Sequence, residues 1–288
     1  MELKVIAYAR NGHTDKFGIP RQSRDESPIL TRIVFEPDFC VREALRGIEG
    51  YSHLWVIWGF SDNERKKDEE ERTLAWSPTV RPPRLGGNRR MGVFATRSPF
   101  RPNPIGLSSV RLVRIEKIET TRSRDHVTTT GNEAKHEGAT GKRLALVISG
   151  ADLLDGTPIY DIKPYLSFSD SHPDALNGFA EETRDYRLAV DWGDVIMTLG
   201  EYHTKHPLIT HLSPTDNTII SRKELEEIAY ILGQDPRPAY QKDPNREYKL
   251  DYGGWRVTFC IAEKPKDEKE RTKEEVVIVK KIEKIEFF

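Results

Sequence analysis

Arginine is concentrated in one stretch of the sequence, between residues 73 and 115. This stretch has eight arginines, no lysine and no acidic residue, so it carries +8 in a chain whose net charge is −1. The remainder of the chain therefore carries −9. A guanidinium group grips phosphate or carboxylate through paired hydrogen bonds and stacks on flat rings, so the stretch predicts an anionic partner. The eight residues are Arg81, Arg84, Arg89, Arg90, Arg97, Arg101, Arg111 and Arg114.

A basic surface patch without a ligand is the alternative interpretation, but solvated faces usually mix both signs of charge. Prolines decide the shape of the stretch, because proline fixes φ and lacks a backbone donor, which excludes a long helix. We expect a rigid loop, a short strand at residues 91–96 and a second rigid loop. Such loops hold a ligand at a small ordering cost. The prolines are Pro78, Pro82, Pro83, Pro99, Pro102 and Pro104.

Two further motifs accompany the arginines. PRQ occupies residues 20–22, in a long polar loop after the first expected strand, and DGTPIYDIKPYL occupies residues 155–166. Together with RPPRLGGNRRMGVFATRSPFRPNPIGLS at residues 81–108, they resemble the TrmO family, also called the TsaA-like or YaeB family. Its members are S-adenosylmethionine-dependent tRNA methyltransferases. The resemblance is strong over residues 1–166, and DPRPAY at residues 235–240 extends it.

The resemblance implies a reaction, a substrate and an assembly. A methyl group would pass from S-adenosylmethionine to the N6 of threonylcarbamoyladenosine, beside the anticodon of threonine tRNA, in a homodimer with each cofactor near the interface. A methyl sulfonium is already a strong electrophile. The enzyme therefore needs chiefly to align the nitrogen with the methyl group, and it needs no covalent nucleophile.

The resemblance also assigns cofactor-binding positions. Arg97 is expected at the carboxylate or ribose of the cofactor and Leu107 at its adenine. Ser61 and Asp62 align with a pair of residues that contacts the cofactor in the family, although the family often has a histidine there. The remaining positions are Pro20, Arg21, Gln22, Asp152, Leu153, Leu154 and Asp155.

Substrate contacts are expected from the other arginines and from the DPRPAY loop. Phosphates and the threonyl carboxylate of the target base would face Arg21 and the arginine stretch, while one cation and one aromatic ring on a stiff loop could grip and stack on tRNA. The residues expected to bind RNA are Arg81, Arg84, Arg89, Arg90, Arg101, Arg237 and Tyr240. Strong general-base help is not required, because the target nitrogen lies between adenine and a carbonyl and its proton is comparatively acidic. If a base acts, Asp155 is the catalytic candidate.

Composition limits the other possibilities. No apolar run approaches the ~20 residues that span a bilayer, and the N terminus lacks the regions of a signal peptide, so we expect a cytoplasmic protein without membrane contact. Cys40 and Cys260 match no metal or redox spacing and are expected to be reduced. His203, His206 and His211 are loosely spaced without a cysteine or carboxylate motif, and we expect no metal.

Hydrophobic periodicity predicts mostly strands in the first part of the chain. Asp161 and Lys163 are expected on one face of the strand that follows the Asp155-Gly156 turn. Expected strands cover residues 3–9, 29–35, 53–60, 109–118 and 143–149, with a short helix at 41–46 and polar loops at 63–72 and 119–142.

The character of the chain changes near residues 169–178. The clearest helix covers residues 221–233, with Ser221 and Glu224 as a capping box and Gly233 as its stop. Strands are expected at residues 194–199 and 255–262, and residues 275–288 are expected to form a final strand or an amphipathic tail.

The sequence therefore predicts a mainly β protein. Residues 1–170 would form an antiparallel β-barrel that binds S-adenosylmethionine, and residues 171–288 a small α+β domain for tRNA recognition. No G-x-G-x-x-G follows a first strand, which agrees with a non-Rossmann methyltransferase. One alternative is a non-catalytic nucleic-acid-binding barrel, with steep salt dependence and no cofactor. The other is a methyltransferase of a small anionic metabolite, for which residues 171–288 would be dispensable.

Overall fold

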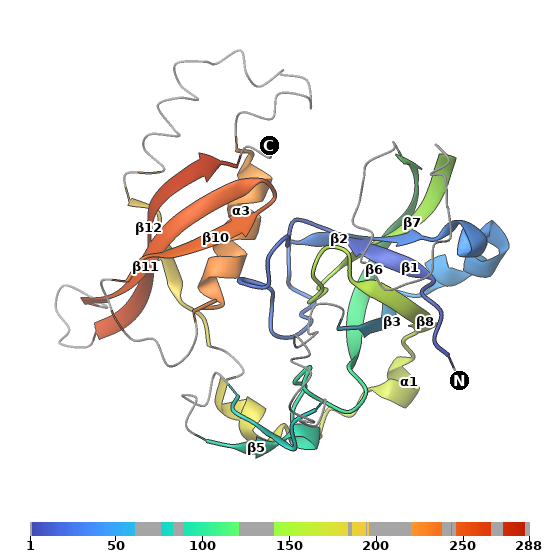
Figure 1. Ribbon diagram of the computed structural model, residues 1–288, viewed down its shortest axis with the longest axis horizontal. Helices are drawn as coiled ribbons and strands as arrows, with labels where there is room; N and C mark the ends of the chain where they lie inside the picture. Colours follow the sequence, from blue (N-terminus) through green and yellow to red (C-terminus); the bar gives the residue numbers. More distant parts are fainter. Residues whose placement is uncertain are drawn as a thin grey trace, which may run out of the picture.

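The computed structural model describes residues 2–60, 76–82, 89–120, 141–183, 186–193, 195, 220–237, 243, 246–265 and 273–285. Strands are the main regular elements of these residues, so the mainly β class predicted from the sequence is confirmed. Figure 1 shows the strands in two bodies, with the N-terminal strands in one and the C-terminal strands in the other.

The N-terminal strands form a closed barrel in the order β1-β2-β7-β6-β3-β8, with each neighbouring pair antiparallel. The ring closes where Tyr8 of β1 lies opposite Pro158 of β8. Alternate side chains point inward and fill the interior, among them Leu54, Leu146 and Ile159, which are fully buried. The six strands are β1 (Ala7–Arg10), β2 (Leu30–Phe35), β3 (His53–Gly59), β6 (Ile105–Thr120), β7 (Gly141–Ser149) and β8 (Pro158–Pro164).

The C-terminal sheet has four strands in the order β10-β11-β12-β9, and β9 runs parallel to β12. Helix α3 (Arg222–Gly233) lies on the face of this sheet that is turned toward the barrel (Figure 1). Ile228 and Leu232 of α3 share one apolar core with Val257 and Phe259 of the sheet. The strands are β9 (Ala189–Asp191), β10 (Tyr248–Tyr252), β11 (Trp255–Pro265) and β12 (Lys273–Lys284).

The predicted capping box of α3 is confirmed. The Ser221 hydroxyl accepts the backbone N–H of Glu224 at 3.2 Å, and the Glu224 carboxylate accepts the backbone N–H of Ser221 at 2.6 Å. The predicted shared face of β8 is also confirmed, because Lys163 and Asp161 form an ion pair at 2.9 Å. Strong local signals of this kind are independent of the rest of the fold.

Several predicted boundaries are wrong. The strand expected at residues 91–96 is only β5 (Met91–Gly92), which pairs with β4 (Thr79–Val80), and Val93–Ala95 form a 3-10 turn. The first strand begins at Ala7 rather than residue 3, and the helix expected at 41–46 is the 3-10 turn Arg42–Leu45. These are short segments whose state depends on tertiary partners.

Strand β6 is longer than predicted, because Ile105–Ser108 pair with β3 directly after Pro104. The polar segment expected at 119–142 begins and ends in paired strands, with Thr120 opposite Gly141. Residues 63–72, 121–140 and 196–199 and the three histidines at 203, 206 and 211 lie outside the described residues. Among the helices that the structure describes, none is long and apolar enough to cross a bilayer.

Candidate functional site

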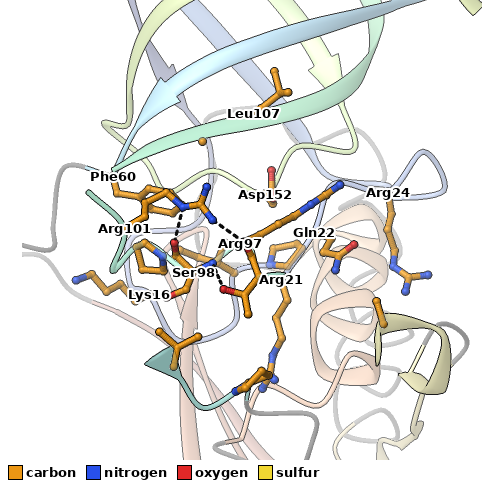
Figure 2. Close-up of a pocket in the computed structure, with 18 of the residues that line it drawn as sticks. Lys16, Arg21, Gln22, Arg24, Phe60, Arg97, Ser98, Arg101, Leu107 and Asp152 are labelled. Carbon is orange, nitrogen blue, oxygen red and sulfur yellow. Dashed lines mark hydrogen bonds between the residues drawn. The ribbon is translucent and has the colours of Figure 1, made fainter. Parts of the chain in front are cut away.

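A pocket of about 1660 Å³ lies where the barrel meets the C-terminal body. Its lining comes from all three sequence motifs, which contribute Arg21, Arg97 and Thr157, and from the C-terminal body. Asp152, in the segment between β7 and the third motif, also lines it. Figure 2 shows Leu107 on the barrel side of the pocket, above Asp152 and Arg97. Tertiary folding thus joins motifs that are more than a hundred residues apart in the chain.

Asp152 is the acidic group on the barrel side of this pocket. The Ser108 hydroxyl donates a hydrogen bond to Asp152 Oδ1, and the Trp58 indole N–H donates to the Ser108 hydroxyl at 2.9 Å. Burial raises the pKa of Asp152, and the Ser108 hydrogen bond and the Arg97 charge oppose that rise. The result is a half-buried carboxylate with a fixed orientation and oxygen lone pairs still available to a ligand.

Ser108 and Trp58 were not among the residues predicted from sequence. Their placement requires close contact between β3 and β6, in which Trp58 lies opposite Gly106. A Cβ atom at position 106 would lie 2.2 Å from the Trp58 ring, so only glycine leaves room for the indole. The strand register then leaves Leu107 53% exposed, facing the pocket (Figure 2). An exposed aliphatic side chain in a pocket suits a flat apolar ring.

Arg101 stabilises the loop at residues 93–101, which we call the arginine loop. Its guanidinium group donates to the carbonyl oxygens of Thr96 at 2.5 Å, Ser98 at 2.9 Å and Val93 at 3.4 Å. These bonds are made by Nε and Nη2 of the guanidinium group. The structure therefore supports a role for Arg101 in holding the loop that carries Arg97, and its contact with RNA stays a prediction.

The loop after β1 supplies the opposite wall. Pro20 is buried and Arg21 and Gln22 are exposed, and all three residues line the pocket. The Arg21 guanidinium donates to the backbone carbonyl of Arg237 at 3.3 Å. Figure 2 shows Gln22 and Arg24 beside the ribbon of α3. The PRQ motif therefore lies between the barrel and the C-terminal body.

Two predicted cofactor residues do not reach the pocket. Leu153 is fully buried in the barrel core. Asp155 accepts the backbone N–H of Asn11 at 2.9 Å and forms an ion pair with Arg10 at 3.3 Å, outside the pocket lining. The structure therefore places both residues outside the pocket lining, and the role of Asp155 as a general base stays a prediction. Leu154 does line the pocket.

Arg237, which was predicted to bind RNA, lies in a buried ion-pair network. It is 9% exposed, and its guanidinium group bonds to Asp235 at 2.9 Å and to Glu275 at 2.6 Å. Burial opposes its charge, but the bonds to these two carboxylates raise the pKa of Arg237. A buried cation that is already neutralised is unsuited to the predicted grip on RNA.

The structure describes three more of the arginines that were predicted to bind RNA. Arg81 is exposed and lines the pocket, while Arg89 and Arg90 are exposed and lie outside its lining.

Cys40 and Cys260 are free thiols. Within the part of the chain that the structure describes, no group of three or more histidine, cysteine or acidic side chains could hold a metal ion. Four predicted residues lie outside the described residues: Ser61, Asp62, Arg84 and Tyr240.

The fold and the pocket define a mainly β protein whose pocket lies at the junction of a closed barrel and a smaller α+β body, unlike a doubly wound nucleotide-binding sheet. The tRNA-methyltransferase O N-terminal domain matches residues 8–171, and the TrmO C-terminal domain matches residues 216–283. This chain belongs to the TrmO family. The resemblance found in the sequence is thereby confirmed.

Relatives and solved structures agree with this membership. A tRNA (adenine(37)-N6)-methyltransferase from Eikenella corrodens is 42% identical over 73% of this chain and 91% of its own length. The protein of the same name from Escherichia coli is 34% identical over 90% of this chain and 91% of its own. Crystal structures of TrmO, including one from Pseudomonas aeruginosa, are 26% identical, cover 98% of both chains and give TM-scores of 0.60 and 0.59.

Proposed function

We propose that this protein transfers a methyl group from S-adenosylmethionine to the N6 of the adenosine beside the anticodon in tRNA, with threonylcarbamoyladenosine of threonine tRNA as the substrate. Membership of the TrmO family and the activity named for its relatives support the reaction. The observation that carries the proposal is the gathering of Arg97, Leu107 and Asp152 in one pocket.

The groups of this pocket fit the cofactor. S-adenosylmethionine has a carboxylate, an ammonium and a sulfonium, ribose hydroxyls and a flat adenine. Arg97 can bind the carboxylate or ribose, Leu107 can pack on the adenine, and the Asp152 carboxylate can accept hydrogen bonds from the ammonium or a ribose hydroxyl. When bound, the cofactor supplies the electrophilic methyl group.

The chain itself contributes alignment. Arg101 fixes the loop that carries Arg97, and Ser108 fixes Asp152, so the groups that hold the cofactor are ordered before it binds. Preorganised contacts bring the attacking nitrogen to the methyl group at a low entropic cost. No protein nucleophile is needed, and the acidity of the N6 proton in the modified base makes a strong general base unnecessary.

The exposed arginines provide the RNA side of the proposal. Arg81 on the pocket rim and Arg89 and Arg90 beyond it can bind tRNA phosphates and the threonyl carboxylate. We assign residues 1–170 to a barrel domain that binds the cofactor and residues 171–288 to a domain that contributes to tRNA recognition. The proposal also includes a cytoplasmic homodimer, whose interface would cover exposed apolar side chains such as Phe94 at 77% and Phe168 at 87%.

Two other functions make different predictions. A non-catalytic RNA-binding barrel would bind tRNA through the same arginines and would not bind S-adenosylmethionine. A methyltransferase of a small anionic metabolite would bind the cofactor but would leave tRNA unlabelled. The structured acidic group at Asp152 favours the enzyme over the binding module, because RNA phosphates gain nothing from a carboxylate in the pocket.

The test incubates the purified protein with methyl-labelled S-adenosylmethionine and threonine tRNA, with and without the threonylcarbamoyl group. Label is expected in the modified tRNA alone. Label in neither tRNA, with tight RNA binding retained, would support the binding module. Cofactor binding without transfer to either tRNA would support a small-molecule substrate.

A further inference from the structure

The loop between β1 and β2 is part of the C-terminal core. Phe17 of this loop stacks on Tyr248 of β10, with ring centroids 6.3 Å apart and ring planes 9° apart. The same ring lies 6.3 Å from the Phe259 ring of β11, at an interplanar angle of 30°. Phe17 thus packs against the C-terminal cluster, three residues before the PRQ motif begins.

Gly18 allows the backbone of this loop to lie close to the side chains of the C-terminal core. Its φ is +96°, a conformation that favours glycine, and a Cβ atom there would lie 2.4 Å from Leu250 Cδ1 and 3.0 Å from Ile231 Cγ2. Leu250 and Ile231 are fully buried. The backbone of the loop is therefore pressed directly onto β10 and α3, two residues before Pro20.

A second contact holds the middle residue of the PRQ motif. Arg21 donates to the carbonyl of Arg237, and Arg237 is fixed in turn by Asp235 and Glu275. The Tyr186 hydroxyl donates to Asp235 at 3.0 Å. Asp235 has a φ of 53°, which is unusual outside glycine and is maintained where surrounding contacts determine the backbone.

The start of the loop is joined to the same body. The backbone N–H of Gly253, in the turn after β10, donates to the carbonyl of Gly12 at 3.0 Å. The rings of His13 and Tyr252 pack in a T-shaped arrangement, with their centroids 5.0 Å apart. Contacts of the C-terminal body therefore precede the short segment that presents Pro20, Arg21 and Gln22 to the pocket, and one further contact lies within it.

We infer that the C-terminal body positions the cofactor-binding loop, and that Leu250 is a positioning residue for S-adenosylmethionine although it is not among the residues lining the pocket. The inference rests on the proposed function, because it takes the pocket to be the cofactor site. It assigns the C-terminal body a second role besides tRNA recognition. Loss of that body would weaken cofactor binding even when no tRNA is present.

The test measures S-adenosylmethionine binding by calorimetry on full-length wild-type protein and on Leu250→Ala, without tRNA. Because Leu250 supports Gly18, its truncation should let the loop shift and raise the Kd for the cofactor about tenfold. In steady-state assays the KM for S-adenosylmethionine should rise more than the KM for tRNA. Leu250→Met keeps the volume and should restore affinity to within about twofold of wild type.

Val277→Ala is the matched control. Val277 is fully buried in the same core but lies on β12, where it pairs with Ile261 and Val190. It should lower the melting temperature without changing cofactor affinity by more than about twofold. If Leu250→Ala does not fold, Leu250→Val provides a smaller truncation with the same expected direction.

Three outcomes can be told apart. Failure of wild-type protein to bind S-adenosylmethionine would reject the proposed function. Wild-type affinity in the folded Leu250 variants would overturn the inference and leave the proposed function intact. Equal losses of affinity in the Leu250 and Val277 variants would also overturn it, because general destabilisation would then explain both.

Discussion

Ser108 donates its hydroxyl hydrogen to Asp152, which lies 44 residues further along the chain, while its oxygen accepts the indole N–H of Trp58. Ser108 is 1% exposed, so both hydrogen bonds are protected from water. The carboxylate on the pocket wall is therefore oriented from behind by the barrel. This arrangement separates two properties that mutation can test: the charge of Asp152 and the support given by Ser108.

Asp152→Asn should weaken cofactor binding without destabilising the fold. Burial raises the pKa of Asp152, so the folded state holds the proton more tightly than the unfolded state, and the ionised form costs stability above the unfolded pKa. A neutral amide removes that cost, so the melting temperature at pH 7 should equal or exceed that of wild type. Calorimetry should show an affinity for S-adenosylmethionine reduced about tenfold.

Ser108→Ala is the complementary variant, and its effect on stability should have the opposite sign. It leaves the Trp58 N–H and a half-buried carboxylate without their partner, which should lower the free energy of unfolding by about 1–3 kcal/mol. Denaturant titration measures this change. A stable Ser108→Ala protein together with an unstable Asp152→Asn protein would contradict the arrangement.

Arg97→Ala should reduce affinity for S-adenosylmethionine by about ten- to a hundredfold, because a charge-assisted hydrogen bond is worth about 1.5–3 kcal/mol. The measurement is again calorimetry without tRNA. Arg111→Ala is the control, since Arg111 pairs with Asp25 at 2.6 Å on the surface, and both side chains are about half exposed. Equal affinities in the two variants would exclude Arg97 from the cofactor site.

Arg101→Lys should loosen the arginine loop although it keeps the charge. A lysine cannot reproduce the planar set of donors that reaches three backbone carbonyls. We expect faster hydrogen exchange at residues 93–101 and weaker cofactor binding. Arg114→Lys, on the exposed face of β6, should change neither; unchanged exchange in Arg101→Lys would show that the brace is dispensable.

The double variant Arg89→Ala and Arg90→Ala should weaken tRNA binding and leave cofactor affinity unchanged. If both side chains neutralise phosphates, the slope of log affinity against log salt should become shallower by about two. Binding titrations at several salt concentrations measure the slope. A slope equal to that of wild type would place these arginines outside the tRNA interface.

Acid should destabilise the protein through His13. Burial lowers the pKa of His13 to about 4, from 6.5, so between these values the unfolded state binds the proton more tightly. Stability is therefore lost as the pH falls through this window, by about 2 kcal/mol at pH 5. His13→Phe keeps a ring against Tyr252 without titrating, and its free energy of unfolding should depend less on pH between 7 and 5. If the free energy of unfolding changes with pH equally in wild type and His13→Phe, His13 is not the group responsible.

Local chemistry was readable from the sequence by itself. The excess of arginine follows from composition, the capping box of α3 from Ser221 and Glu224, and the shared face of Asp161 and Lys163 from the period of a strand. The family motifs were sufficient to select Arg97, Leu107 and Asp152, and the structure brings these three residues into one pocket.

Only the tertiary structure decided which predicted groups are available to a ligand. Arg101 and Arg237 look like the other arginines in sequence, but one is occupied by backbone carbonyls and the other by two carboxylates. Leu153 and Asp155 flank a pocket residue, yet one points into the barrel core and the other pairs with Arg10.

The contacts of Ser108 and Leu250 also required the fold. They join residues from distant parts of the chain, and the register of β3 on β6 and the packing of a loop against β10 determine them. The period of a sequence shows which side chains share a face, but it does not show what that face meets. For this protein the sequence determined the kinds of groups present and their local backbone, and long-range packing determined which of them form the site.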